Sequence, residues 1–166
     1  MIILRPLKLE DYENVLAWSK DDTFCQANGW ERNRNEEELH MWWERCVTNN
    51  TEDFHRLGIE GDGQLIGYVD LACIRGTEAE IGIAIGESGL WGKGIGVHSI
   101  LSLIEYAEKE YSITTLIAET HEANTRSRKM LERVGFTEVS RIGVEEYMGK
   151  DSRLIQYKLD LLDSQK

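Results

Sequence analysis

Cysteine is scarce in this sequence, and its distribution argues against several kinds of protein. The 166 residues include Cys25, Cys46 and Cys73, an odd and widely spaced set that favours reduced thiols over a disulfide framework and lacks zinc-site spacing. No apolar run approaches the roughly 20 residues that span a bilayer. The apolar start of "MIILRPLKLEDYE" is also too short for a signal peptide. We therefore expect a cytoplasmic protein with no metal site and no membrane partner.

Positive charge and proline are scarce too. There are 19 basic residues against 30 acidic ones, and the formal net charge is -11. Because nucleic-acid-binding proteins usually present a basic face, and no basic cluster appears, no nucleic-acid partner is expected. The one proline is Pro6, and no linker, repeat or low-complexity stretch divides the chain. The length then predicts a single domain over residues 1–166 with a sizeable core.

What the sequence does contain is an alternation of helical and strand periods, which predicts a mixed α/β fold. The strongest predicted helix spans residues 94–111. Its expected apolar stripe consists of Val97, Ile100, Leu101, Ile104 and Ala107. A later helix, residues 124–135, has Asn124 at its start and Gly135 as its stop.

The predicted order of elements is β-α-α-β-β-β-α-β-α-β-β, a central mixed sheet flanked by helices. The strand–helix–strand unit from residue 78 to residue 120 should form a parallel crossover. The strands are expected at 1–7, 53–60, 64–74, 78–86, 114–120, 136–147 and 153–162, the helices at 9–20, 36–49, 94–111 and 124–135, and a polar loop at 21–35.

Three glycines stand at alternate positions in "GLWGKGIGVHS", residues 89–99, where the strongest helix begins. Glycine is a poor helix former, but it lets the backbone approach a bulky ligand because it has no Cβ. The unpaired first-turn amides, the helix dipole and Lys93 favour an anion, with phosphate or pyrophosphate as the natural ligand.

Two common phosphate-binding motifs do not fit this segment. A Walker A loop needs Ser or Thr where Gly94 stands, and the dinucleotide fingerprint needs a glycine where Val97 stands. A tight strand–helix turn with no ligand stays open as the alternative.

Three blocks of the sequence resemble the GCN5-related N-acetyltransferase (GNAT) superfamily. "EIGIAIGESGLWGKGIGVHSI" is similar to its motif A, whose turn reads Gln/Arg-x-x-Gly-x-Gly/Ala and here runs from Trp91 to Gly96. "ETHEANTRSRKMLERVGF" resembles the branch of ribosomal-protein N-terminal acetyltransferases (RimJ/RimL-like), where the "WGKG" of the turn is also common. The opening "LRPLKLEDYENV" is similar to the superfamily's first strand and helix. The resemblance implies the GNAT fold and acetyl transfer from acetyl-CoA to a primary amine by direct attack in a ternary complex.

The resemblance also implies which residues hold acetyl-CoA. Two neighbouring parallel strands splay apart in this family, and Ile83, Ala84 and Ile85 would make main-chain contacts to the pantetheine arm, as a strand pairs with a peptide. Asn124 and Ser127 would reach the pantetheine and the sulfur. The turn around the pyrophosphate would consist of Trp91, Gly92, Lys93, Gly94, Ile95, Gly96 and Val97.

The chemistry needs a base for the amine and an acid for the leaving thiolate. The resemblance implies Glu80 or Glu119 as the base, and His121 is a further group near the site. Leu131 occupies the place of the tyrosine acid of many GNATs, so Ser127 is the candidate acid. A GNAT-like domain that binds acyl-CoA with little turnover, and a structural domain with no cofactor, are the alternatives.

The acceptor is less well defined. The resemblance implies that it lies over the segment between the first two helices and over the last hairpin. In the segment, carboxylates and the rings of Trp30, Trp42 and Trp43 suit an ammonium group, and a solvated acidic helix with core tryptophans is the alternative. A protein N-terminus, a polyamine, an aminoglycoside-like amine and a small amine all stay open. Family habit implies a homodimer.

Overall fold

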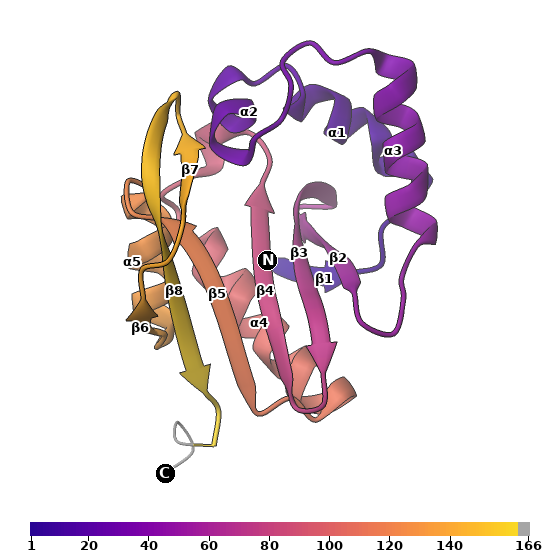
Figure 1. Ribbon diagram of the computed structural model, residues 1–166. Helices are drawn as coiled ribbons and strands as arrows, with labels where there is room; N and C mark the ends of the chain where they lie inside the picture. The colour runs from indigo at the N-terminus through magenta and orange to yellow at the C-terminus, as the bar shows by residue number, and fades with distance from the viewer. Residues whose placement is uncertain (163–166) are drawn as a thin grey trace.

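Strand pairing defines the architecture of the computed structural model, which describes residues 1–162 (Figure 1). An eight-stranded sheet has the order β1-β2-β3-β4-β5-β8-β6, and β7 pairs with β8. β4 and β5 pair in parallel, as the crossover predicts, and the other pairs are antiparallel. The strands are β1 Ile2–Arg5, β2 His55–Gly61, β3 Gln64–Arg75, β4 Glu78–Ile85, β5 Thr115–His121, β6 Thr137–Ser140, β7 Val144–Tyr147 and β8 Lys150–Asp160.

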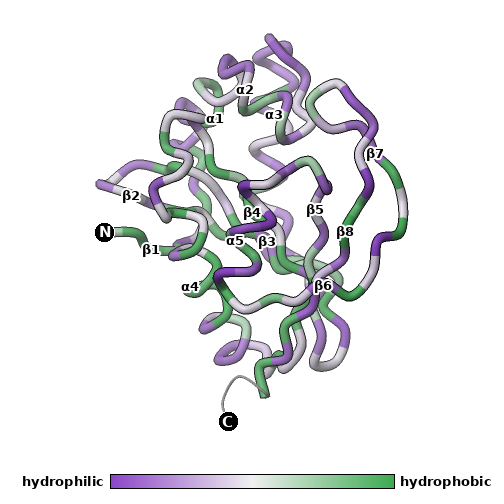
Figure 2. The backbone as a smooth tube through the Cα atoms, turned by 90° about the vertical axis from the view of Figure 1, so that its left-hand side faces the viewer, coloured by the Kyte–Doolittle hydropathy of each residue, from purple (hydrophilic) through white to green (hydrophobic). Residues whose placement is uncertain are grey.

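The helices form two groups, each with its own core. α4 and α5 cover one face of the sheet, and α1, α2 and α3 gather at one end of the molecule in both views (Figures 1 and 2). The larger core includes Ile100 and Leu116, and the smaller one includes Trp18 and Trp43. The helices are η1 Leu9–Asp11, α1 Tyr12–Trp18, α2 Asp22–Asn28, α3 Glu36–Thr48, η2 Ser88–Leu90, α4 Ile95–Tyr111 and α5 Thr125–Val134.

The mixed α/β fold is confirmed, but the predicted order missed two elements. α2 lies inside the expected loop 21–35. Its start is capped by the Asp21 carboxylate, which accepts a hydrogen bond from the Phe24 amide at 3.0 Å, and its end by Gly29 at φ 67°. Phe24 and Cys25 are fully buried. The helix was missed because only a few apolar residues stand among many polar ones.

The expected strand 136–147 is two strands, β6 and β7. β6 pairs with the middle of β8, while β7 pairs with its first residues, 150–153. Gly143, at φ 102°, lies in the break between them. Residues that favour strands continue across this break, so the sequence pattern alone predicted a single strand.

The apolar stripe of α4 needs one correction. Leu101 is 48% exposed, whereas Leu103 is 1% exposed and packs in the core. Each helical residue turns by about 100°, so a stripe through Ile100, Ile104 and Ala107 takes in residue 103 and leaves out residue 101. The predicted caps of α5 are confirmed, with Asn124 at its start and Gly135 in the left-handed conformation at its end.

Three negative findings hold over residues 1–162. No helix there is long and apolar enough to cross a membrane. No group of three or more His, Cys, Asp or Glu side chains in this range could hold a metal ion. The three cysteines are free thiols, and Cys25 is the buried one.

Candidate active site

β4 and β5 separate after a short stretch of pairing. Glu78, Ala79 and Glu80 pair with residues 115–117, and no further pair joins the two strands within the described chain. β4 nevertheless continues to Ile85 and β5 to His121. The backbone edge of residues 82–85 that faces β5 is therefore open to a ligand, as the resemblance implies for an extended amide-bearing arm.

The glycines after β4 have two different physical roles. Gly92 and Gly94 have φ values of 80° and 81°, a conformation that other residues rarely adopt. A Cβ built on either would meet no atom within 4 Å, so the backbone of this turn faces open space. Gly96 lies in the first turn of α4, where a Cβ would come 2.5 Å from the Met130 sulfur of α5. Two glycines shape the turn, and the third lets α4 and α5 pack closely.

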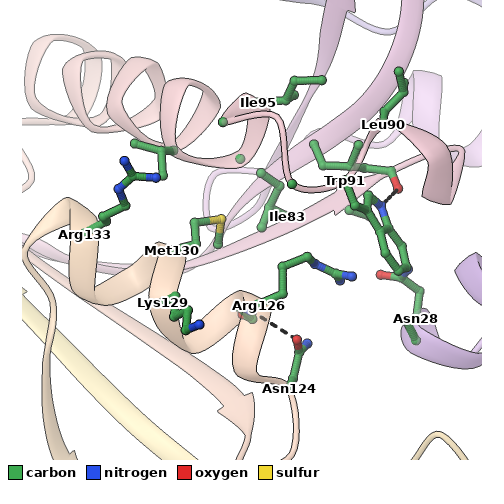
Figure 3. Close-up of a pocket in the computed structure, with 18 residues that line it drawn as sticks. Asn28, Ile83, Leu90, Trp91, Ile95, Asn124, Arg126, Lys129, Met130 and Arg133 are labelled. Atoms are coloured by element: carbon green, nitrogen blue, oxygen red, sulfur yellow. Dashed lines mark hydrogen bonds between the residues drawn. The ribbon is translucent and has the colours of Figure 1, made fainter.

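A cavity of about 270 Å³ lies between this turn, β4 and α5 (Figure 3). Eleven of the twelve residues that the sequence predicts for the cofactor line it. Lys93 is the exception, since it is exposed and lies outside the lining. The residues brought together are Ile83, Ala84, Ile85, Trp91, Gly92, Gly94, Ile95, Gly96, Val97, Asn124 and Ser127.

Three cationic side chains that line this cavity were not predicted from the sequence. Arg126, Lys129 and Arg133 of α5 all line it. They recur at intervals of three and four residues directly after the Asn124 cap, which puts them on one face of the helix. That spacing was the signal available in the sequence. Together they make the cavity suitable for an anionic ligand such as a phosphate.

Trp91 connects the turn to the helix opposite. Its indole Nε1 donates a hydrogen bond to the Ile85 carbonyl at 3.0 Å. The Arg126 guanidinium lies over its ring, 3.5 Å from the centroid. Burial lowers the pKa of Arg126. In Figure 3 Arg126 extends toward Trp91, with Asn28 of α2 on the other side of the ring.

A second cavity, of about 260 Å³, adjoins the first. Glu119 and His121 of β5 and Glu145 of β7 line it, and no Lys or Arg among residues 1–162 does so. The two cavities share six residues, Ala27, Asn28, Ile83, Asn124, Ser127 and Met130. A cationic chamber and an anionic chamber therefore meet at the gap between β4 and β5.

Ser127 is at this junction. Its backbone amide donates a hydrogen bond to the side-chain Oδ1 of Asn124 at 3.1 Å, whereas its hydroxyl has no hydrogen-bond partner in the described chain. Leu131, one turn further on, is 3% exposed and has no proton to give. Ser127 is thus the side chain of α5 with a free hydroxyl at the place where the cavities join.

The two candidate bases differ in position. Glu119 lines the second cavity and accepts a hydrogen bond from the Gln156 amide at 2.8 Å. Glu80 lines neither cavity. Since Glu80 pairs with Ile117, it lies on the same face of the sheet as Glu119. Burial and then the charge of Glu119 raise the pKa of Glu80.

The segment expected to hold the acceptor has a mainly structural role. Trp43 is fully buried and donates its Nε1 hydrogen to the Lys8 carbonyl at 2.9 Å. Trp30 and Trp42 pack edge to face, 5.2 Å between ring centroids. None of the predicted acidic or tryptophan residues of this segment lines either cavity in the described chain. From α2, Ala27 and Asn28 do so.

Asp21 joins this segment to the glycine turn. Its carboxylate accepts hydrogen bonds from the Ser88 amide at 2.7 Å and the Ser88 hydroxyl at 2.9 Å, while also capping α2. Burial raises its pKa, but the hydrogen bonds from Ser88 and Phe24 outweigh this effect and hold the pKa below its ordinary value. No sequence signal connects positions 21 and 88.

Comparison with known proteins gives a consistent result. The profile of the family described as "Acetyltransferase (GNAT) domain" matches residues 1–137. An uncharacterized protein of Methanocaldococcus jannaschii, MJ1062, is 29% identical over 135 residues, which are 81% of this chain. The match spans only 28% of that relative's length.

Solved structures share the fold over nearly the whole chain. The microcin C7 self-immunity acetyltransferase MccE, in complex with acetyl-CoA and AMP, has a TM-score of 0.83 and 22% identity, with 96% of this chain and 92% of that one covered. RimL, a ribosomal alpha-N-protein acetyltransferase in complex with coenzyme A, has a TM-score of 0.80 and 16% identity, with 96% and 94% covered. At such identities the likeness shows the fold.

Proposed function

Because the chain belongs to the GNAT acetyltransferase family, we propose that it transfers an acetyl group from acetyl-CoA to an acceptor amine by direct attack in a ternary complex. The observation that carries the proposal is the pair of adjoining chambers with opposite charge. One suits the phosphates of a coenzyme, and the other suits an ammonium group. We also propose that residues 1–166 form a single acetyltransferase domain.

The first chamber fits coenzyme A in three respects. The left-handed turn at Gly92 and Gly94 faces open space, so backbone amides can surround a pyrophosphate. The cations of α5 supply charge for phosphate groups. The open edge of β4 at Ile83 and Ala84 can pair with the amides of the pantetheine arm.

Acetyl-CoA supplies the activated acyl group, and the protein has to position the acceptor and move protons. In this proposal Glu119 takes a proton from the acceptor ammonium, directly or through water. The free amine can then form the new C–N bond as the C–S bond breaks. Ser127 relays to the leaving sulfur the second proton that the nitrogen gives up, so that the thiol leaves neutral and the serine hydroxyl is restored. Glu80 lies on the same face of the sheet but outside the chamber, so it does not contact the acceptor in this proposal.

Buried Leu131 favours a second candidate, an acyl-CoA-binding module with little turnover. One assay distinguishes the two. The purified protein is incubated with acetyl-CoA and a panel that contains a peptide N-terminus, a polyamine, an aminoglycoside and small amines, and acetylated products are identified by mass spectrometry. Our proposal predicts an acetylated amine. Saturable acetyl-CoA binding with no acetylated amine would favour the module. A homodimer in the cytoplasm stays a prediction from the sequence.

A further inference from the structure

The carboxylates around the second chamber lack cationic partners. Elsewhere on the sheet, half-buried carboxylates are paired with arginine: Asp70 with Arg56 at 2.6 Å, and Glu60 with Arg5 at 2.8 Å. Glu80, Glu119 and Glu145 form no ion pair with any Lys or Arg among residues 1–162. No lysine or arginine of this range therefore pairs with the three carboxylates, of which Glu119 and Glu145 are exposed and Glu80 is half-buried.

Glu119 is hydrogen-bonded to a neutral amide, and Glu145 has only a distant contact with an imidazole. Glu119 is held by the neutral amide of Gln156. His121 Nε2 lies 4.0 Å from the nearest Glu145 oxygen, too far for a hydrogen bond. The His121 ring is itself fixed, since it stacks on Tyr147 with 4.9 Å between centroids and 23° between planes. Both carboxylates thus remain available to a cation in the chamber.

Resting on the proposed function, we infer that the acceptor carries a second cationic group, which Glu145 binds while the reacting amine lies at Glu119. The two carboxylates enter one chamber from different strands, β5 and β7. Ile81, Ala118 and Leu154 also line it, and they provide apolar contact for a short methylene chain. An aliphatic diamine matches this arrangement of charge and apolar surface. Glu145 is then a specificity-determining residue.

The inference separates acceptors of the same length by the charge of their far end. 1,6-Diaminohexane ends in an ammonium, 1-aminohexane in a methyl group and 6-aminohexanoate in a carboxylate. We expect kcat/KM to fall in that order, by about tenfold or more at each step, because an unpaired charge in such a chamber strongly changes binding.

Glu145→Gln tests the role of that residue, and Glu146→Gln is its matched control. Both residues are exposed on β7, but Glu146 does not line the chamber. Glu145→Gln should bring the kcat/KM ratio of diamine to monoamine to within about threefold of one. The control should keep the wild-type ratio.

Three results would overturn the inference: equal use of the three amines, a ratio that Glu145→Gln leaves unchanged, or acetyl-CoA binding with acetylation of none of them. A calorimetric titration with acetyl-CoA on the same preparations separates this failure from that of the proposed function. If acetyl-CoA itself does not bind, the proposed function fails, and the inference fails with it.

Discussion

Replacing Asp21 by serine separates the two structural roles of this carboxylate. Serine caps helices about as well as aspartate, so Asp21→Ser keeps the start of α2. Its shorter side chain cannot maintain the bonds to the amide and hydroxyl of Ser88. The variant therefore releases the turn that begins at η2 and leads into Gly92 and Gly94.

The magnitude follows from the two lost hydrogen bonds. A hydrogen bond to a charged group contributes about 1.5–3 kcal/mol net, and since Asp21 and Ser88 are both partly exposed we take the lower end, about 3 kcal/mol for the two. For a domain of this size each kcal/mol shifts Tm by about 2–4 °C, which gives a decrease of about 6–12 °C. The KM for acetyl-CoA should rise as well, because the released turn lines its chamber.

Thermal unfolding followed by circular dichroism measures the effect, with Asp22→Ser as the control. The Asp22 side chain is 63% exposed and pairs with an exposed Arg32, so its loss should cost less than about 1 kcal/mol.

The lowered pKa of Asp21 determines how the effect on stability depends on pH. A carboxylate with a lowered pKa stabilises the fold above its unfolded pKa, and this stabilisation is lost as the pH falls. The difference between wild type and Asp21→Ser should therefore shrink below about pH 4. Equal Tm values for the two variants would show that the bonds from Ser88 to Asp21 do not stabilise the fold, and a difference that stays constant down to about pH 3 would show that the charge of Asp21 does not contribute.

Two further predictions concern Ser127 and Glu80. Ser127→Ala should lower kcat about 100-fold while the affinity for acetyl-CoA stays within about twofold, because only the proton donor is lost. Thr125→Ala, on the same helix but outside both chambers, should match wild type. Equal rates for the two variants in steady-state assays would show that Ser127 has no part in the mechanism. Glu80→Gln should raise Tm at pH 7 and leave it unchanged at about pH 4, since a carboxylate with a raised pKa destabilises the fold only where it is ionised. A lower Tm at pH 7 would show that Glu80 stabilises the fold.

Local sequence signals predicted most of the fold, and together with the resemblance to the GNAT superfamily they indicated most residues that line the first chamber. α5 begins at Asn124 and ends at Gly135, as the capping preferences of these residues predict. Gly92 and Gly94 adopt a conformation that only glycine tolerates well, and Gly96 has the close packing contact, so the spacing of the three was informative. Such features depend on a few neighbouring residues, so the sequence carries them directly.

The second chamber depends on relations between distant residues. Glu119 and Glu145 meet there because β8 pairs with β5 along one stretch and with β7 along another. Asp21 and Ser88 are joined by the packing of α2 over the turn. The resemblance placed the acceptor over the segment near Trp43 and over the last hairpin. The Trp43 side chain is required by the core, whereas Glu145 and Leu154 of the hairpin line the second chamber. These juxtapositions depend on strand register and helix packing, which no local sequence pattern encodes.

Calorimetric titration with acetyl-CoA shows whether the glycine turn binds the coenzyme, with wild type, Gly94→Glu and Gly76→Glu compared. Both glycines have positive φ and open surroundings, so either substitution introduces a similar backbone strain. Residue 94 lies in the chamber, whereas residue 76 lies in the turn between β3 and β4. We predict saturable binding by wild type and Gly76→Glu, and an affinity lower by about 100-fold or more for Gly94→Glu, whose carboxylate would repel the phosphates. Equal affinity of all three proteins, or no binding by wild type, would contradict the assignment of this turn to coenzyme A.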